Sequence, residues 1–271
     1  MSRLNLIFAH LKGHRAALVS YLTGGDPTLA DTVVLMHTLV AAGTDILEVG
    51  MPFSDPMADG PVIQMSHQRA LAAGATTLGV LRCVAAFRET DTKTPIVLMG
   101  YVNPVEAMGY RTFAQAARDA GVDGVILVDM PPEEALEWRE VALEHGVDPI
   151  FLLAPTSSPT RLRRISEASR GFVYYVALKG VTGAAHLNID EVAEKVIAVR
   201  HYTDLPVGVG FGIRDPESAA RLGQFADAII VGSAIVSRIS AALNQDQAIA
   251  DVRAFVGSLR AALPEYRVER V

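Results

Sequence analysis

Eight short apolar runs recur along the chain, and segments with the periodicity of amphipathic helices lie between them. The runs are nearly continuous in hydrophobic residues rather than alternating, which is typical of parallel strands covered on both faces. They occupy residues 16–23, 45–50, 95–101, 124–130, 149–155, 171–178, 206–212 and 227–233. Eight strands that alternate with helices in 271 residues predict a closed (β/α)₈ barrel, the TIM barrel fold. An open doubly wound sheet is the alternative.

Three segments exceed the minimal barrel. Residues 2–12 have the apolar spacing of an additional helix, which could close the bottom of the barrel. The predicted helices at 28–43 and 132–146 each end in glycine, as helices commonly do. The loops after strands 2 and 6 are long, and such loops carry chemistry and lids in barrels. Because the sequence contains no linker or low-complexity segment, we expect a single barrel domain over residues 1–271.

Composition and charge exclude several functional classes. The net charge is −6 and no basic run occurs, which argues against nucleic-acid binding and against anionic membranes. Charged residues interrupt the N-terminal apolar pattern, and no apolar run reaches ~18 residues, so we expect neither a signal peptide nor a membrane span. These features predict a cytoplasmic enzyme. The lone Cys83 lies in an apolar helical pattern and is interpreted as a core thiol.

Carboxylates and tyrosines dominate the predicted carboxyl ends of the strands, where barrel active sites lie. None of the four lysines lies in a strand, which disfavours Schiff-base chemistry. No histidine pair occurs at a strand end, so we expect no histidine-based metal site. The strand-end residues are Thr23, Asp26, Glu48, Asp55, Asp59, Tyr101, Asn103, Asp129, Tyr174 and Tyr175. This set favours acid–base chemistry without a metal or cofactor.

Glu48 stands inside the second apolar run, between Leu47 and Val49. A carboxylate in an apolar run is costly unless it is paired or has a function. Alternation along a strand puts Glu48 on the same face as Ile46 and Gly50, which we interpret as the barrel interior near its mouth. The alternative is an outward Glu48 paired with a helix arginine. An interior position would raise the pKa of Glu48, which suits a group that exchanges protons near neutral pH.

The loop after Glu48, residues 52–61, contains three prolines and the carboxylates Asp55 and Asp59. The prolines limit the conformations open to this loop. Asp59 is interpreted as a second candidate acid at this strand end. For both aspartates the alternative is an ordinary turn residue, and that alternative is stronger for Asp55.

Small residues follow strands 7 and 8. Gly212 comes directly before a helix that begins near Asp215, and Gly232 with Ser233 opens the next helix. Backbone N–H groups at such turns and helix N-termini often bind phosphate in barrels, and Gly183 in the loop after strand 6 could add another. Glycine at these turns also occurs for steric reasons alone. The pattern predicts a small phosphorylated substrate.

The motif PFSDPMADGP at 52–61, preceded by LEVG at 47–50, resembles the signature of the tryptophan synthase alpha chain family. Further stretches follow in the family's order and spacing, so the resemblance covers the whole chain: YLTGGDP (21–27), GYVNP (100–104), VDMP (128–131), GVTG (180–183), VGVGFGI (207–213) and VGSAIV (231–236). The resemblance implies a (β/α)₈ barrel. It also implies cofactor-independent retro-aldol cleavage of indole-3-glycerol phosphate to indole and glyceraldehyde 3-phosphate.

Matching positions imply roles for individual residues. Glu48 matches the catalytic glutamate, Asp59 the aspartate that engages the indole N–H, and Tyr174 the tyrosine beside the substrate. Thr182 matches the threonine that latches the loop after strand 6 onto Asp59. The phosphate-binding positions match Gly183, Gly212, Gly232 and Ser233, and the indole pocket matches Tyr21, Met99, Ile126, Leu152 and Phe211.

The resemblance also implies a partner. The family works as an alpha2beta2 complex in which indole passes through a tunnel to a beta chain that carries pyridoxal phosphate. Asp55, Pro56, Asn103 and Pro131 match positions near that interface. The alpha chain itself is expected to hold no cofactor and no metal.

Two departures from the family pattern bear on the loop after strand 6 and on the indole pocket. Lys179 precedes GVTG where many members have small residues or a Ser-Arg stretch, and Tyr21 stands where some members have Phe. The alternative functions are another phosphate-binding barrel, such as phosphoribosylanthranilate isomerase or indole-glycerol-phosphate synthase, and a catalytically silent barrel that only activates a beta chain. The second of these enzymes would require strand-end lysines, which this chain lacks.

Overall fold

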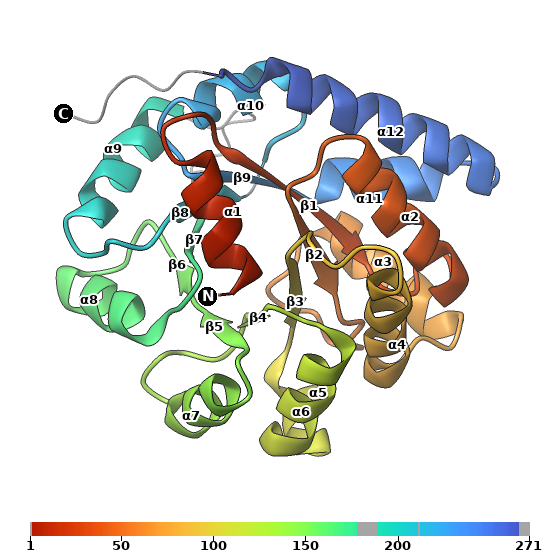
Figure 1. Ribbon diagram of the computed structural model, residues 1–271, viewed down its shortest axis with the longest axis horizontal. Helices are drawn as coiled ribbons and strands as arrows, with labels where there is room; N and C mark the ends of the chain where they lie inside the picture. The colour runs from red at the N-terminus through yellow and green to blue at the C-terminus, as the bar shows by residue number, and fades with distance from the viewer. Residues whose placement is uncertain (1, 178–188, 211, 266–271) are drawn as a thin grey trace.

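The computed structural model describes residues 2–177, 189–210 and 212–265 (Figure 1). Its strands are β1 Ala17–Thr23, β2 Ile46–Gly50, β3 Ile96–Gly100, β4 Gly124–Leu127, β5 Asp148–Ile150, β6 Leu152–Leu153, β7 Val173–Val176, β8 Val207–Gly210 and β9 Ala228–Val231. Its helices are α1 Arg3–Leu11, α2 Leu29–Ala41, α3 Pro61–Ala72, α4 Thr77–Arg88, α5 Val102–Met108, α6 Tyr110–Ala120, α7 Leu136–Glu144, α8 Pro159–Ala168, α9 Ile189–Arg200, α10 Pro216–Gly223, α11 Ser233–Ala241 and α12 Gln245–Ala262.

All pairings between these strands are parallel, in the order β5-β4-β3-β2-β1-β9-β8-β7-β6. The two end strands of this order are the halves of the predicted fifth strand, 149–155, which is interrupted at Phe151. β5 pairs with β4 and β6 pairs with β7, so one chain segment joins both ends of the sheet. Figure 1 shows the resulting ring of strands with helices around its outside. The predicted (β/α)₈ barrel is confirmed.

Helix α1 closes the N-terminal end of the barrel, as the apolar spacing of residues 2–12 predicted. Ser2 caps the helix, since its side chain accepts a hydrogen bond from the N–H of Asn5. Leu4, Phe8 and Leu11 are buried in one cluster with the inward side chains of the strands, among them Val97, Ile126, Ile150, Phe172 and Ile230. Figure 1 shows α1 lying across the ring of strands. Because this end is filled, the opposite end is left for a site.

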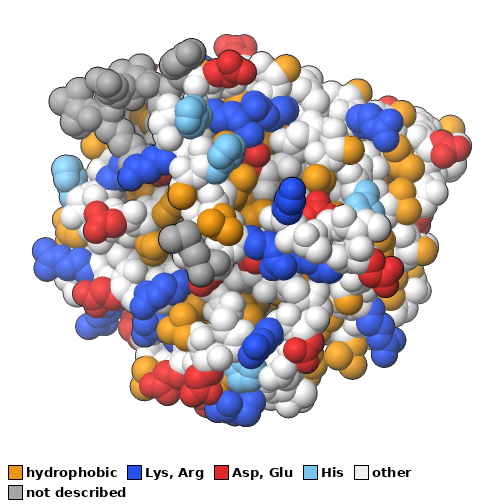
Figure 2. Space-filling model, in the orientation of Figure 1, with side chains coloured by type: hydrophobic (Ala, Val, Ile, Leu, Met, Phe, Trp, Pro, Cys, Tyr) orange, Lys and Arg blue, Asp and Glu red, His pale blue; other side chains and the backbone are white. Residues whose placement is uncertain are grey.

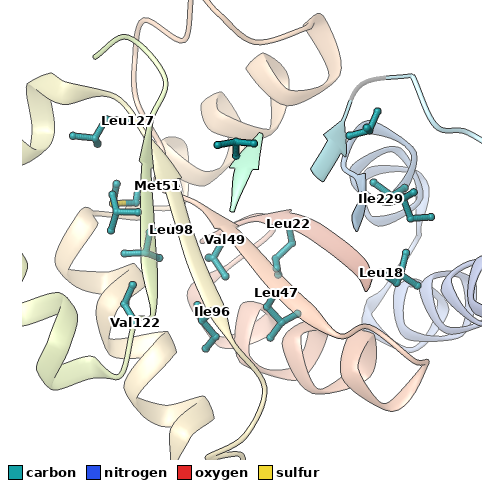
Figure 3. Packing of buried hydrophobic residues seen from close by; sticks show 14 of the residues in the cluster. Leu18, Leu22, Leu47, Val49, Met51, Ile96, Leu98, Val122, Leu127 and Ile229 are labelled. Carbon is teal, nitrogen blue, oxygen red and sulfur yellow. The ribbon is translucent and has the colours of Figure 1, made fainter. Parts of the chain in front are cut away.

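A second apolar layer lies between the strands and the surrounding helices. Leu18, Leu22, Leu47, Val49 and Leu98 belong to this outer cluster, and Figure 3 shows their side chains on the helix-facing side of β1, β2 and β3. The inward residues of the same strands lie in the inner cluster. Burial on both faces explains why the strands contain continuous rather than alternating apolar residues.

One predicted helix begins later than expected. The pattern at 132–146 predicted a helix from Pro132, but α7 begins at Leu136. The N–H of Glu134 donates to the carbonyl of Pro131 at 3.1 Å, so these residues form a turn before the helix. Asp129 does not cap α7; its carboxylate accepts a hydrogen bond from the N–H of Val102 at the start of α5 instead.

The face on which α1 lies has basic and acidic side chains interspersed (Figure 2). Among the described residues no single helix combines the length and the hydropathy needed to cross a membrane. Helices α3 and α4 have the necessary length and hydropathy only when they are taken as one segment, and they meet at a bend of 93°.

Candidate active site

Glu48 points into the barrel, as the interpretation of its strand predicted, and not outward to a helix arginine. Leu47 and Val49 belong to the outer apolar cluster and Ile46 to the inner one, so Glu48 must face inward between them. The residue is 1% exposed, and neither carboxylate oxygen has a hydrogen-bond partner among the described residues. Burial, and secondarily the nearby charge of Asp59, raises the pKa of Glu48 to about 8. A buried carboxyl with no partner is expensive, and it indicates a functional rather than a stabilising role.

Tyr101, directly after β3, fixes the loop between β2 and α3, which we call loop 2 (residues 51–60). Its phenol donates a hydrogen bond of 2.8 Å to Oδ2 of Asp59 and accepts one of 3.0 Å from the N–H of Ala58. The ring of Phe53 stacks on Tyr101 with 5.1 Å between the ring centroids. The amide of Gln64 donates to the carbonyl of Asp59 at 2.9 Å. Asp59 is therefore held in a defined position over the barrel mouth.

Electrostatic effects tie four groups into one site. Burial raises the pKa of Asp59, and the Tyr101 hydrogen bond acts against that rise. The phenols of Tyr21 and Tyr174 have pKa values well above their usual range because they are buried, and the charges of Glu48 and Asp59 add to the effect. Both phenols therefore stay protonated beside two carboxyl groups.

Two glycines make room for these phenols. A Cβ atom at Gly50 would lie 2.1 Å from the Tyr21 hydroxyl oxygen, and one at Gly210 would lie 2.3 Å from that of Tyr174. Neither distance is possible for a real Cβ, so each glycine is required by the tyrosine opposite it. Tyr174 rather than Tyr175 is the inward residue, because Tyr174 lies in the inner cluster and Tyr175 in the outer one.

The predicted indole-pocket residues that the structure describes all face the interior of the barrel. Tyr21 and Met99 share a cluster with Ile63 of α3. Met99 is in register with Ile126 on the neighbouring strand, and Leu152 is in register with Tyr174. Met99, Ile126 and Leu152 all contribute to the inner apolar cluster. The fifth predicted residue, Phe211, lies outside the described residues.

The structure describes three of the four predicted phosphate-binding residues, namely Gly212, Gly232 and Ser233. Gly232 is the N-cap of α11 and provides no side-chain cap, and Ser233 is the first residue of that helix. An uncapped helix N-terminus presents backbone N–H groups and a positive partial charge to an anion. Gly212 has φ +84°, which favours glycine, and space is open around it. Gly183 and Thr182 lie outside the described residues.

The four residues predicted to lie near a partner chain differ in their exposure to solvent. Asp55 and Asn103 are exposed, Pro131 is half-buried and Pro56 is buried. Beside Pro56, the side chain of Met57 is 82% exposed. Loop 2 thus directs Asp59 toward the barrel and an apolar side chain toward solvent.

The sequence analysis assigned no role to Tyr101 or to His67, yet both organise the site. Tyr101 had been noted only as a strand-end residue. His67 on α3 is 2% exposed and bonds both loop 2 and Tyr21. The spacing of Ile63, Ser66, His67 and Ala70, the buried residues of α3, is the signal that could have identified His67 as inward-facing. Cys83 is a buried free thiol, as interpreted.

Comparisons with known proteins agree with these observations. A family model for the tryptophan synthase alpha chain matches residues 8–264. A tryptophan synthase alpha chain from Nitrosococcus oceani is 56% identical over 265 residues, covering 97% of this chain and 98% of that relative. The crystal structure of tryptophan synthase subunit alpha from Legionella pneumophila has a TM-score of 0.89 at 43% identity, with 97% and 98% of the two chains covered.

A chain in a crystal structure of tryptophan synthase from M. tuberculosis has a TM-score of 0.87 at 38% identity and covers 97% of this chain and 98% of its own length. The sequence motifs, the barrel fold and the similar proteins all point to the same family, and the similarity covers nearly the full length of the sequence. This chain belongs to the tryptophan synthase alpha chain family.

Proposed function

We propose that Glu48 is the proton donor and acceptor for the family's reaction, the cleavage of indole-3-glycerol phosphate to indole and glyceraldehyde 3-phosphate. The bond between indole C3 and the first glycerol carbon breaks after C3 receives a proton. The hydroxyl on that carbon loses its proton as the aldehyde forms, and the bonding electrons return to the indole ring. A group that holds its proton near neutral pH and can release it is therefore required.

The observation that carries this proposal is the buried, unpartnered carboxyl of Glu48. With a pKa of about 8, Glu48 is mostly protonated at pH 7 and can deliver a proton to C3. Once ionised, its carboxylate lies in a low-dielectric interior and has no stabilising partner among the described residues. It is then a strong base toward the substrate hydroxyl.

Asp59 is proposed to act at the other end of the indole. Protonation at C3 creates positive charge at the ring nitrogen, and a fixed carboxylate there stabilises that charge. Tyr101 supports this role, since its hydrogen bond opposes the protonation of Asp59 and fixes its orientation. Tyr174, whose phenol is influenced by both carboxyl groups, is proposed to lie beside the substrate.

The remaining residues are proposed to bind the substrate. Tyr21, Met99, Ile126 and Leu152 would enclose the indole, which needs an apolar surface. The N-terminus of α11 at Gly232 and Ser233, together with Gly212, would receive the phosphate. By family resemblance alone, Phe211 would complete the indole pocket, Gly183 the phosphate site and Thr182 the latch onto Asp59.

We further propose that the chain forms a single barrel domain that carries no cofactor and acts in the cytoplasm within an alpha2beta2 complex. Pyridoxal phosphate is expected on the beta chain, to which indole passes. Asp55, Pro56, Asn103 and Pro131 are proposed to lie at the contact. The exposed apolar side chain of Met57, which follows Pro56 in loop 2, supports this placement for the loop 2 residues.

Indole release by the purified chain, alone and with a beta chain, tests the proposal. Glu48→Gln should nearly abolish release while substrate binding stays largely intact, and Asp59→Asn should also reduce release severely. A Glu48→Gln rate above about a tenth of the wild-type rate is inconsistent with the assigned role. Failure of the wild-type chain to release indole under both conditions would favour a silent barrel that only activates its partner.

A further inference from the structure

His67 is a buried titratable residue that the proposed chemistry does not use. It lies on α3, between loop 2 and β1. Its Nδ1 accepts a hydrogen bond of 3.1 Å from the backbone N–H of Phe53, and its Nε2 lies 3.4 Å from the hydroxyl oxygen of Tyr21. One imidazole therefore contacts both the lid that carries Asp59 and a wall of the proposed indole pocket.

Donor and acceptor capacity fixes the tautomer of His67. The Phe53 N–H can only donate, so Nδ1 of His67 carries no hydrogen. The neutral ring then has its hydrogen on Nε2, and this N–H donates to the Tyr21 hydroxyl oxygen. A cationic ring would place a second donor against the Phe53 N–H and break that contact.

The hydrogen bonds of Ser66 and Thr23, on the far side of Tyr21, lead to the same donor and acceptor assignment. The hydroxyl of Ser66 donates to the carbonyl of Ile63 at 2.7 Å, so it must accept at 2.6 Å from the hydroxyl of Thr23. Thr23 has then used its only hydrogen, and it accepts from the Tyr21 hydroxyl at 3.1 Å. Tyr21 is left with acceptor capacity toward His67. The hydrogen-bond directions deduced from the two ends agree, so these groups form one continuous hydrogen-bond chain from the Phe53 N–H to the Ile63 carbonyl.

Burial makes this chain costly to break. The four side chains that form it are Tyr21, Thr23, Ser66 and His67, and none is more than 4% exposed. A buried donor or acceptor that loses its partner is destabilised more than an exposed one. Burial lowers the pKa of His67, although the carboxylates of Asp59 and Asp26 act against this. The neutral ring is the state that the hydrogen bonds require.

The two residues that contact His67, Phe53 and Tyr21, each lie next to groups proposed to act on the substrate. The Phe53 ring stacks on Tyr101, whose phenol holds Asp59. The Tyr21 ring lies next to the start of α11, where a Cβ at Gly232 would be 3.5 Å from it. His67 thus connects the support of Asp59 with the pocket wall beside the proposed phosphate site.

We propose that His67 is a positioning residue for the cleavage reaction, whose Nδ1 tethers loop 2 at Phe53 and whose Nε2–H orients the Tyr21 phenol. The inference rests on the proposed function. Loss of the Phe53 tether weakens the placement of Asp59 and lowers kcat. Loss of the Tyr21 contact changes the pocket and raises KM.

Two substitutions separate the two contacts. In His67→Asn the side-chain oxygen can occupy the position of Nδ1 and keep the Phe53 tether, but no donor reaches Tyr21. In His67→Gln the side-chain NH₂ can occupy the position of Nε2 and keep the Tyr21 contact, but Phe53 loses its acceptor. Tyr21→Phe removes the same contact as His67→Asn from the opposite side, together with the hydrogen bond that the Tyr21 hydroxyl donates to Thr23.

Steady-state indole release should divide these variants into two groups. We expect His67→Gln to lower kcat by about threefold to tenfold with little change in KM, the range typical of one hydrogen bond. His67→Asn and Tyr21→Phe should each raise KM by a similar factor and leave kcat within about twofold. Because Tyr21→Phe already removes the contact that His67→Asn removes, the double variant Tyr21→Phe/His67→Asn should be no worse than Tyr21→Phe alone.

His37→Asn and His37→Gln are matched controls, since His37 lies on α2 against Phe87, outside the site. They should leave both constants unchanged, and the folded fraction of every variant is measured by thermal unfolding. Wild-type values for both His67 variants would overturn the proposal, as would kcat losses that only follow the folded fraction. Additive effects of Tyr21→Phe and His67→Asn would also overturn it. Wild-type indole release in the same assay tests the proposed function separately.

Discussion

The phenol of Tyr101 donates a hydrogen bond of 2.8 Å to the carboxylate of Asp59, 42 residues earlier in the chain. Tyr101 directly follows β3, which is part of the rigid barrel, whereas Asp59 lies in loop 2. A second bond, from the N–H of Ala58 to the same phenol, fixes the backbone next to Asp59. A side chain at the end of a barrel strand therefore holds the carboxylate of Asp59 in a fixed position, although Asp59 itself lies in a loop.

Removing this phenol should weaken catalysis without removing any proposed catalytic group. Tyr101→Phe keeps the ring that stacks on Phe53 but leaves Asp59 and the Ala58 N–H without their partner. Hydrogen bonds to charged groups contribute more than neutral ones, so we expect kcat/KM for indole release to fall by about tenfold to a hundredfold.

Tyr110→Phe is the matched control for that variant. Tyr110 begins α6 and packs on Trp138 rather than on loop 2, so the loss of its hydroxyl should leave kcat/KM unchanged. A Tyr101→Phe enzyme with wild-type kcat/KM would show that the two bonds do not position Asp59 for the reaction.

Glu48 should lower the stability of the protein in a pH-dependent way. Its pKa is about 8 in the folded state against an ordinary value of 4.5, so the folded protein binds the proton more tightly than the unfolded chain. Well below pH 4.5 both states are protonated, so the ionisation of Glu48 does not affect stability there. As pH rises through this interval the unfolded chain ionises first, and Glu48 increasingly destabilises the fold.

Glu48→Gln should therefore increase the free energy of unfolding, by an amount that grows from pH 4.5 to about 8 and then stays constant. Since each pKa unit is worth about 1.4 kcal/mol, the upper limit of the gain is roughly 5 kcal/mol. Urea unfolding of both proteins across this pH range measures the difference. A gain that is independent of pH would mean that the charge of Glu48 is not its cause.

The architecture was predictable from the sequence because each strand is buried on both faces and is followed by a helix. The interruption at Phe151 was not, since the apolar pattern of 149–155 continues through it while the hydrogen-bond ladder changes partner there. The start of α7 was also missed. A turn closed by Pro131 and Glu134 has the same composition as a helix start, and the Asp129 carboxylate, which could have capped such a helix, binds the N–H of Val102 instead.

For the site, alternation put Glu48 on one face with Ile46 and Gly50, and the unusual loop after the strand favoured the interior for that face. The support around it did not follow from sequence. The bonds from Tyr101 to Asp59 and from His67 to Phe53 join separate elements, and local periodicity carries no information about such contacts. Individual residues of the pocket were assigned by resemblance rather than by physical reasoning.

Gly50 should tolerate no side chain, because a Cβ there would lie 2.1 Å from the Tyr21 hydroxyl oxygen. Gly50→Ala must displace Tyr21, so we expect a loss of stability of about 1–3 kcal/mol and a higher KM. Adding Tyr21→Leu, which removes the obstructing phenol, should recover part of the stability but not the KM. Thermal unfolding and steady-state kinetics measure the two effects.

Gly257→Ala provides the comparison, since no atom lies within 4 Å of a Cβ at that position in α12. Replacing a helix glycine that has room for a Cβ by alanine is expected to stabilise by up to about 1 kcal/mol. If Gly50→Ala behaved like Gly257→Ala, the close approach of Tyr21 to β2 would not constrain the site.

Helix α1 should contribute to stability without contributing to catalysis, because it fills the end of the barrel opposite the site. Leu4 is 0% exposed, and its Cδ1 occupies space beside Gly124 and Gly171, where added Cβ atoms would lie 3.2 and 3.0 Å away. Leu4→Ala would leave a cavity among rigid strands, and we expect it to reduce the free energy of unfolding by about 2–5 kcal/mol.

Leu6→Ala on the same helix is the control, since that side chain is 55% exposed and should contribute little. The kcat of Leu4→Ala, measured well below its unfolding temperature, should equal that of the wild-type chain. A parallel fall in kcat would mean that packing at the closed end is transmitted along the strands to Glu48 and Tyr174. Tyr174 and Ile46, which lies two residues before Glu48 on β2, belong to the same inner cluster as Leu4, so this measurement decides whether α1 is only structural.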